Sequence, residues 1–547
     1  MAPQGPRSRF DTHEVFNQSP PYENVDLFLS DEPLRGAVAA NGGGRESASL
    51  SEFGRHWGSA EMLALGREAN ENPPKLHAFD AKGFRFDQIE FHPAYHRLMG
   101  ESIAAGLHCS TWTESGRCAP PPAEVTRAAR FYIAAQVETG HLCPITMTRA
   151  APAALVAAPG LAEKIVPKLL ARSYDPAFRP FWQKSGLTLG MGMTEKQGGT
   201  DVRANTTAAT PAGEGYSLVG HKWFMSAPMS DAFLVLAQAP GGLTCFLLPR
   251  FRPDGSLNAL RLQRLKDKLG NRSNASSEVE FTEAFAWRVG EEGAGIRTIL
   301  QMVQLTRLDC AIASAGLMRM ALAQAVHHCR HRNVFQKRLY DQPMMRAVLA
   351  DMALEVEGAV ALVFRLCAAH ERAGDDAREA AYARLLTPAT KYAVCKAAPA
   401  FVYEAMECLG GNGYVEESIL PRLYREAPVN PIWEGSGNVM CLDVLRALRG
   451  HEEAGLAAAL TREVAPEAAD NSFVAGSTAT DEAAARALVG RLATLASATA
   501  LAASAPAAVT EAFVHTRLRH KRGALYGAVA IDAATSELLL QRALPQA

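Results

Sequence analysis

The spacing of apolar residues predicts helices towards both ends of the chain and strands between them. From about residue 51 to 180, apolar positions recur every three or four residues, as in amphipathic helices. Between 185 and 290, Gly, Pro and Asp separate short apolar runs, which predicts β-hairpins. Long helical patterns return at 291–449, and the charged, then Thr- and Ala-rich stretch at about 450–480 is read as a linker. We therefore expect an α+β protein with an irregular N-terminal extension (1–50), a helical domain (51–184), a β-domain (185–290), a helical bundle (291–450) and a helical tail (451–547).

Composition restricts the classes of partner. The 547 residues exceed one compact core, and 56 basic against 57 acidic residues give a net charge of −1, which draws the whole protein neither to nucleic acid nor to an acidic membrane. Ten cysteines without a C-x-x-C pair predict free thiols and a cytoplasmic location. Residues 1–16 lack the apolar core of a secretion signal, and the Ala-rich run at 493–509 contains Ser, Thr and Pro, so we expect no membrane association.

One acidic residue stands in an unusual setting within "VNPIWEGSGNVM" (429–440). Glu434 follows Trp433 and precedes Gly-Ser-Gly and an apolar run, and Asn438 is predicted to cap a helix at 439–449. The amides at such a helix start favour a negative group, which is either a ligand phosphate or Glu434 itself. The alternative interpretation is a capped loop whose acidic residue only complements the helix dipole.

Two further stretches carry groups that suit a ring cofactor. "LGMGMTEKQGGTDVRANTTAA" (189–209) offers hydroxyls and exposed amides for a polar ring edge or a phosphate, although an ordinary polar turn has the same composition. "GHKWFMSAP" (220–228) places Trp223 and Phe224 beside Ser226, so an aromatic face and a hydroxyl lie together. Core aromatics are the alternative there.

Other motifs are excluded by their context. "VGEEGAGIR" (289–297) looks like a glycine-rich phosphate loop but lacks the strand–turn–helix setting of a dinucleotide-binding unit, so we expect a turn into a helix. The sequence contains no H-E-x-x-H, no G-x-S-x-G and no Cys/His set at metal spacing, so no metal site is expected.

Taken in their order along the chain, the three stretches resemble segments of the acyl-CoA dehydrogenase family, and the resemblance covers roughly residues 60–450. The resemblance implies an acyl-CoA dehydrogenase-like fold with an appended helical domain, a homotetramer, FAD as cofactor, an acyl-CoA or related small substrate, and Glu434 as catalytic base. "RNVFQ" (332–336) matches a family segment that reaches the neighbouring subunit's FAD, with Gln336 in place of glycine. The implied FAD-binding residues are Met191, Thr194, Thr200, Phe224, Met225, Ser226, Arg332, Phe335, Ile432, Trp433, Gly435, Ser436, Gly437 and Asn438.

The resemblance is closer to one branch, the bacterial adaptive-response proteins, through "THEVFNQSPP", "LCPITMT" and "PIWEGSGNVMCLDVLR". This branch implies non-specific binding of double-stranded DNA, protection from DNA alkylation and weak isovaleryl-CoA dehydrogenase activity. Isovaleryl-CoA dehydrogenases keep their base on an earlier helix, at the place of Thr306 here, which favours Glu434 as base and argues against an isovaleryl preference. The alternative is a fully active short- or branched-chain dehydrogenase without a DNA role. The implied DNA-binding residues are Arg446, Arg517, Arg519, Lys521 and Arg522.

The charge of the tail argues against a broadly basic surface. Residues 451–547 contain eight Lys and Arg against ten Asp and Glu, a net of −2. A local cluster can still neutralise phosphates without reading bases, whereas the alternative is a solvated helix face.

Overall fold

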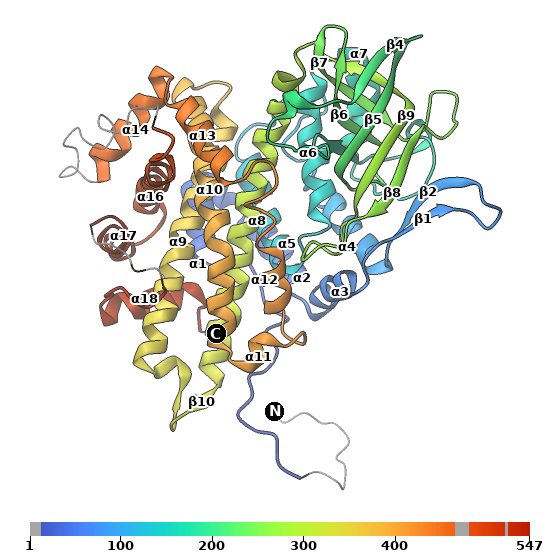
Figure 1. The fold of residues 1–547 in the computed structure, drawn as a ribbon. Helices are drawn as coiled ribbons and strands as arrows, with labels where there is room; N and C mark the ends of the chain where they lie inside the picture. Colours follow the sequence, from blue (N-terminus) through green and yellow to red (C-terminus); the bar gives the residue numbers. More distant parts are fainter. Residues whose placement is uncertain (1–11, 465–480, 520–522, 524, 547) are drawn as a thin grey trace.

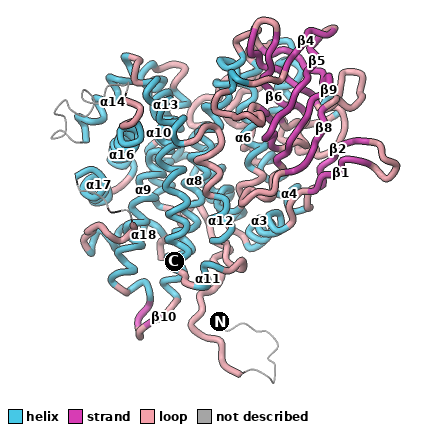
Figure 2. The backbone as a smooth tube through the Cα atoms, viewed as in Figure 1, coloured by secondary structure: helices cyan, strands magenta, loops and turns pink. Residues whose placement is uncertain are grey.

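The computed structural model describes residues 12–464, 481–519, 523 and 525–546. Helices fill most of the chain, and the strands gather on one side except for a short hairpin at residues 333–338, which lies at the lower end of the helices (Figure 2). The β-domain and the C-terminal tail lie on opposite sides of a bundle of long helices (Figure 1).

The N-terminal part is helical but contains one hairpin. Its helices are α1 (Glu32–Ala40), α2 (Ser47–Trp57), α3 (Ala60–Glu71), α4 (Pro93–Ala104), α5 (Ala123–Val137), α6 (Leu142–Leu155) and α7 (Pro159–Leu169). Strands β1 (Lys75–Phe79) and β2 (Arg85–Glu90) pair antiparallel between α3 and α4. The expectation of an irregular extension up to residue 50 was wrong, because α1 and part of α2 lie there. Asp31 caps α1 by accepting from the Leu34 amide at 3.0 Å, and a nine-residue helix is too short to show a clear period.

The middle domain is a small barrel of seven strands. They are β3 (Leu189–Gly192), β4 (Ala208–Ala212), β5 (Gly215–Ser226), β6 (Ala232–Ala239), β7 (Gly242–Pro249), β8 (Leu260–Leu265) and β9 (Ser276–Val289). Pairings β6–β4–β5–β9–β7–β6 close a ring, β3 extends it at β6, and β8 pairs with β9. The prediction of hairpins was only partly right, because β3 and β4 both pair with β6 in parallel.

Three long helices form the centre of the molecule, α8 (Gly295–His331), α9 (Pro343–Arg372) and α10 (Ala377–Cys408). Helix α8 is buried on nearly all sides between α5, α6, α9 and α10. The glycine-rich stretch at 289–297 is the turn that was expected, since β9 ends at Val289 and α8 begins at Gly295. Shorter elements complete the bundle, namely β10 (Asn333–Val334), β11 (Lys337–Arg338), α11 (Gly411–Tyr414), α12 (Leu420–Glu426) and α13 (Gly437–Ala447).

The tail packs on the outer face of the bundle. It contains α14 (His451–Val464), α16 (Ala485–Ser504), α17 (Ala507–Val514) and α18 (Ala533–Ala543). The expected linker from 450 was wrong, because α14 begins at His451; residues 465–480 lie outside the described residues. Helix α16 is long and apolar enough to cross a membrane by composition alone, but it packs against α9, α10 and α14.

Candidate active site

Glu434 lies on a tight turn between α12 and α13. Its backbone is left-handed, with φ of 57°, and Gly435 follows with φ of 104°. A non-glycine residue at positive φ is strained unless its surroundings hold it, and such strain concentrates at functional sites. The turn therefore places the Glu434 carboxyl group in a defined position although three of its neighbours are Gly, Ser and Gly.

The Glu434 carboxylate faces helix α8. The Thr306 hydroxyl donates to Glu434 Oε2 at 2.9 Å, so the position that the resemblance matched to the base of isovaleryl-CoA dehydrogenases holds a hydrogen-bond donor here. Burial raises the pKa of Glu434, while Thr306, Lys391 and Arg307 act in the opposite direction by favouring the charged form. The carboxyl group is thus a stronger base than an exposed glutamate.

Two cations fix the main chain of this turn. Arg307 Nε donates to the Glu434 carbonyl at 3.0 Å, and Lys391 Nζ donates to the Gly435 carbonyl at 2.8 Å. Arg307 also pairs with Asp443 of α13 at 2.7 Å. Helices α8, α10 and α13 therefore converge on the turn, and sequence reasoning identified the glutamate without these supports.

The prediction that Asn438 caps the following helix was wrong. Helix α13 begins at Gly437 with Ser436 at the N-cap position, and no side chain caps it. The Asn438 side chain instead accepts from Nε of Arg486 on the tail helix α16, at 2.8 Å.

The Glu434 turn forms one wall of the candidate site, and the β-domain contributes the second. Phe224 is 48% exposed, and the Ser226 hydroxyl lies 3.1 Å from that of Ser276 on the neighbouring strand. Met225 is fully buried with its side chain against Gly192, so only its main chain is available to a ligand. The alternation of a strand explains why Phe224 faces outwards and Met225 inwards.

The segment before this wall is held by a buried ion pair that sequence reasoning missed. Lys222 donates to Glu195 at 2.8 Å, and both side chains are fully buried. Burial alone would raise the pKa of Glu195, but Lys222 and the Thr206 and Thr207 amides hold it at about 2. Thr194 beside the pair accepts from the Trp223 amide through its carbonyl at 2.9 Å. Thr200, also an FAD-binding candidate, lies exposed beyond it.

The two walls meet at one place. Met191 of β3 and Trp433 of the glutamate turn pack against the same apolar cluster. Cys143, at the start of α6, is close enough to Ser226 for a hydrogen bond and to Glu434 for an electrostatic effect, and burial raises its pKa to about 12. The structure therefore brings together β3, β5, α6 and the turn before α13, as the sequence predicted for one site.

Arg332 and Phe335 lie elsewhere in the chain. Phe335 is in the turn of the β10–β11 hairpin and Arg332 directly precedes it, at the opposite end of the bundle from α13 (Figure 1). Phe335 is 92% exposed, and Arg332 donates to the Asn17 carbonyl at 2.6 Å. Within one chain these residues do not reach the Glu434 turn, so their expected FAD contact requires a neighbouring subunit.

The predicted basic cluster is only partly exposed. Arg446, at the end of α13, and Arg519 are exposed. The prediction for Arg517 was wrong, because its side chain is 5% exposed and forms ion pairs with Asp351 and Glu355 of α9. The sequence shows where cations gather but not which acids neutralise them after folding. Lys521 and Arg522 lie outside the described residues.

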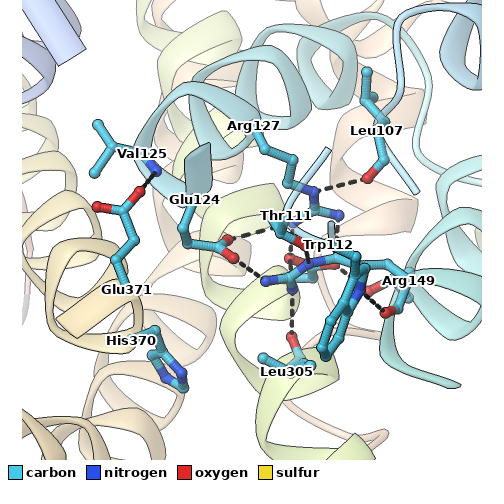
Figure 3. A network of polar contacts seen from close by, with 12 residues as sticks. Leu107, Thr111, Trp112, Glu124, Val125, Arg127, Arg149, Leu305, His370 and Glu371 are labelled. Atoms are coloured by element: carbon cyan, nitrogen blue, oxygen red, sulfur yellow. Dashed lines mark hydrogen bonds and ion pairs between the residues drawn. The ribbon is translucent and has the colours of Figure 1, made fainter. Parts of the chain in front are cut away.

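A buried polar network secures the helices behind the site (Figure 3). Arg149 of α6 contacts Glu124 of α5, the Leu305 carbonyl at 3.4 Å and Asp309 at 3.2 Å. Arg127 donates two hydrogen bonds to the Asp309 carboxylate, one of them at 2.7 Å. Two cations and two anions on α5, α6 and α8 thus compensate one another, as buried charges must. Nothing local in the sequence signals pairs that are so far apart in the chain.

The residues on both walls fit a flavin. Phe224 is 48% and Ile432 66% exposed, which is unusual for large apolar side chains unless they meet a ligand. The Ser226 hydroxyl lies beside Phe224, and the N-terminal amides of α13 follow Ile432 in the chain. FAD combines a flat apolar ring, polar ring edges and a pyrophosphate, which are the groups that such side chains and amides bind.

Comparison with known families divides the chain as the fold does. Residues 17–176 match the family described as the adaptive response protein AidB N-terminal domain. Residues 190–284 match the acyl-CoA dehydrogenase middle domain, and residues 293–449 match the acyl-CoA dehydrogenase C-terminal domain.

Individual relatives agree with these matches. The chain is 55% identical to AidB of Escherichia coli (strain K12) over 449 residues, which cover 82% of each chain. It is 34% identical to acyl-CoA dehydrogenase family member 11 of Caenorhabditis elegans over 80% of this chain and 72% of that one. The crystal structure of Caenorhabditis elegans ACDH-11 in complex with C11-CoA superposes with a TM-score of 0.82 and 26% identity, over 99% of this chain and 94% of that one.

Proposed function

The chain belongs to the acyl-CoA dehydrogenase family and is an FAD-dependent oxidoreductase of the AidB type, and on this premise we propose that it oxidises acyl-CoA thioesters with Glu434 as the base. The observation that carries the proposal is the Glu434 carboxylate, held by Thr306 on a strained turn at the junction of the two walls. A site that used FAD only as a structural element would need no base there.

The reaction removes one hydrogen from each of two neighbouring carbons and leaves a carbon–carbon double bond. Bound FAD supplies the acceptor for the hydride that leaves the β-carbon. Glu434 takes the α-proton, and the thioester oxygen must be stabilised as negative charge develops on it. We assign that hydrogen bond to the main-chain amide of Glu434, as the family resemblance implies.

The surroundings of Glu434 suit this task. A general base works best when its pKa is near the working pH, and burial moves the pKa of Glu434 upwards from that of an exposed glutamate. Thr306, Lys391 and Arg307 favour the ionised form, so the base stays available to accept a proton. Lys391 and Arg307 also hold the turn through the carbonyls of Gly435 and Glu434.

Anaerobic titration of the purified FAD-loaded protein with acyl-CoAs tests the proposal. We expect butyryl-CoA to bleach the visible flavin band, and Glu434→Gln to abolish the bleaching while FAD stays bound. We propose weak activity with isovaleryl-CoA; undecanoyl-CoA should be included because a relative binds a C11-CoA. Bleaching that survives in Glu434→Gln would show that another group is the base, and no bleaching with any of the three would refute the dehydrogenase role.

We further propose that the protein binds double-stranded DNA without sequence specificity, as part of a response to DNA alkylation. Exposed Arg446, in the last turn of α13, and exposed Arg449, just beyond this helix, support the proposal, since they can neutralise phosphates. The similarity to AidB, a protein grouped under adaptive response, also supports it. Arg517 takes no part in this proposal, because it serves as a buried ion-pair partner.

Fluorescence anisotropy with a labelled duplex at several salt concentrations tests the DNA proposal. The Arg446→Ala, Arg449→Ala protein should bind more weakly and with a shallower salt dependence, because two phosphate contacts are lost. Arg203→Ala, which changes an exposed arginine of the middle domain, is the matched control and should behave as wild type. Equal affinity for all three proteins would remove α13 from the proposed surface and leave a plain dehydrogenase.

A homotetramer and a cytoplasmic location complete the proposal. The exposed Phe335 on the β10–β11 hairpin supports assembly, because a side chain that is 92% exposed in one chain can be buried by another. Cysteines that are all free thiols, nine of them buried, suit a reducing compartment. Phe335→Asp should shift the mass measured by light scattering to a smaller species and weaken FAD binding if this hairpin joins two subunits.

A further inference from the structure

A lysine beside the β-domain wall is linked to the candidate flavin site through two serines. Lys268 Nζ donates to the Asn274 carbonyl at 2.6 Å and to the Ser276 hydroxyl at 3.1 Å. The Ser276 hydroxyl lies 3.1 Å from the Ser226 hydroxyl, because these residues are paired across β5 and β9. Ser226 is the residue that the family resemblance assigns to the flavin.

The chemistry of the three groups fixes the direction of these bonds. An ammonium group has donors and no lone pair, so Ser276 must accept from Lys268. The Ser276 proton then points away from Lys268, and the Ser226 oxygen is the acceptor that lies within reach. Ser226 in turn accepts from Ser276, which leaves its own proton for an acceptor outside the pair. The sulfur of Cys143 is near, but a neutral thiol is a weak acceptor, so a polar atom of bound flavin is the stronger partner.

We propose that Lys268 is a positioning residue that, through Ser276, presents the Ser226 hydroxyl as a hydrogen-bond donor to bound flavin. The proposal rests on FAD binding alone, and neither DNA binding nor the identity of the acyl substrate enters it. A donor aimed at the ring stabilises the negative charge that flavin gains on reduction. Lys268 therefore makes the bound flavin easier to reduce.

The environment of Lys268 makes this effect sensitive to pH. Burial lowers the pKa of Lys268 to about 8, against the opposing influence of Cys143, Glu426 and Glu138, which face it from α6, α12 and the end of α5. When Lys268 loses its proton it can accept a hydrogen bond, and the direction of the serine pair is no longer fixed. The side chain of Lys266, two residues earlier, makes other contacts. It pairs with Glu278 at 2.6 Å and lies over the rings of Trp223, at 3.2 Å, and Phe224, at 4.7 Å from the ring centres.

The midpoint potential of the bound flavin tests the proposal, measured by equilibration with reference dyes at pH 7 in the absence of acyl-CoA. For Lys268→Met we expect the equilibrium constant for two-electron reduction of the flavin to fall by about tenfold, which corresponds to a midpoint potential lower by ~30 mV. Ser276→Ala keeps the charge but breaks the link, and should lower the equilibrium by a similar factor. Lys268→Arg should stay near wild type because a guanidinium also only donates.

Lys266→Met is the matched charge control, because it removes a cation that contacts Phe224 rather than the serine hydroxyls, and it should shift the potential much less than Lys268→Met. Equal shifts in Lys266→Met and Lys268→Met would indicate a plain charge effect and overturn the proposal, as would a wild-type potential in Ser276→Ala. If Lys268→Met fails to retain FAD, Ser276→Ala and Lys268→Arg still decide the question. Between pH 7 and 9 the difference between wild type and Ser276→Ala should shrink, and a difference that stays constant would contradict the role of the Lys268 proton.

Discussion

Replacing Thr306 by Val tests how the pKa of the base is set. The change removes the hydroxyl that donates to Glu434 Oε2 at 2.9 Å and keeps the shape of the side chain. A hydrogen bond to a charged group contributes about 1.5–3 kcal/mol, which is about 1–2 pKa units. The Thr306 oxygen also lies 3.0 Å from the Val303 carbonyl, so its single proton is shared between two acceptors. We therefore expect a rise of about 1 unit in the pKa of Glu434.

The acidic limb of the pH profile of kcat/KM reports this pKa in the free enzyme. With butyryl-CoA and an artificial electron acceptor, the limb should move upwards by about 1 pH unit in Thr306→Val, because the charged form has lost a partner. Thr306→Ser retains the hydroxyl and should follow the wild-type profile. A limb that stays in place in Thr306→Val, while Glu434→Gln is inactive, would show that this hydrogen bond does not set the pKa.

Three further changes test the supports of the fold and of the site. Burial raises the pKa of Glu371 to about 7, so this residue lowers the free energy of unfolding of the protein as pH rises from about 4.3 to 7. Glu371→Gln should flatten this dependence of stability on pH. With the partial exposure of the side chain discounted, it should add about 1–2 kcal/mol to the free energy of unfolding at pH 8, measured in urea. Arg517→Ala should lower the free energy of unfolding by about 3–5 kcal/mol, because the buried Asp351 carboxylate loses the cation that pairs with it. The double change Arg517→Met, Asp351→Asn should recover most of this lost stability, because it removes both charges. Lys391→Met removes the donor to the Gly435 carbonyl, so we expect a loss of about 1–3 kcal/mol in urea unfolding and a higher pKa of Glu434 in the pH profile; wild-type values for both would contradict the contact.

Local patterns were enough for much of the fold. The change from helical to strand-like and back to helical periodicity gave the order of the domains, because both periods arise from a few neighbouring residues. The same holds for Glu434, whose glycine-rich setting is visible in twelve letters. Patterns failed for the short helix α1 near the N-terminus. They also failed for Asn438, whose side chain contacts the distant tail helix instead of capping α13.

The sequence by itself therefore determined the family, the three-part order and the candidate base, since motifs and periodicity are properties of adjacent residues. Only the tertiary structure decided that Thr306 faces Glu434, that Arg517 is neutralised by α9, and that Lys268 reaches Ser226 through Ser276. These contacts depend on which side chains meet after the helices and strands have packed. Charge pairing and hydrogen-bond direction are set by that packing, and residues far apart in the chain carry no local sign of it.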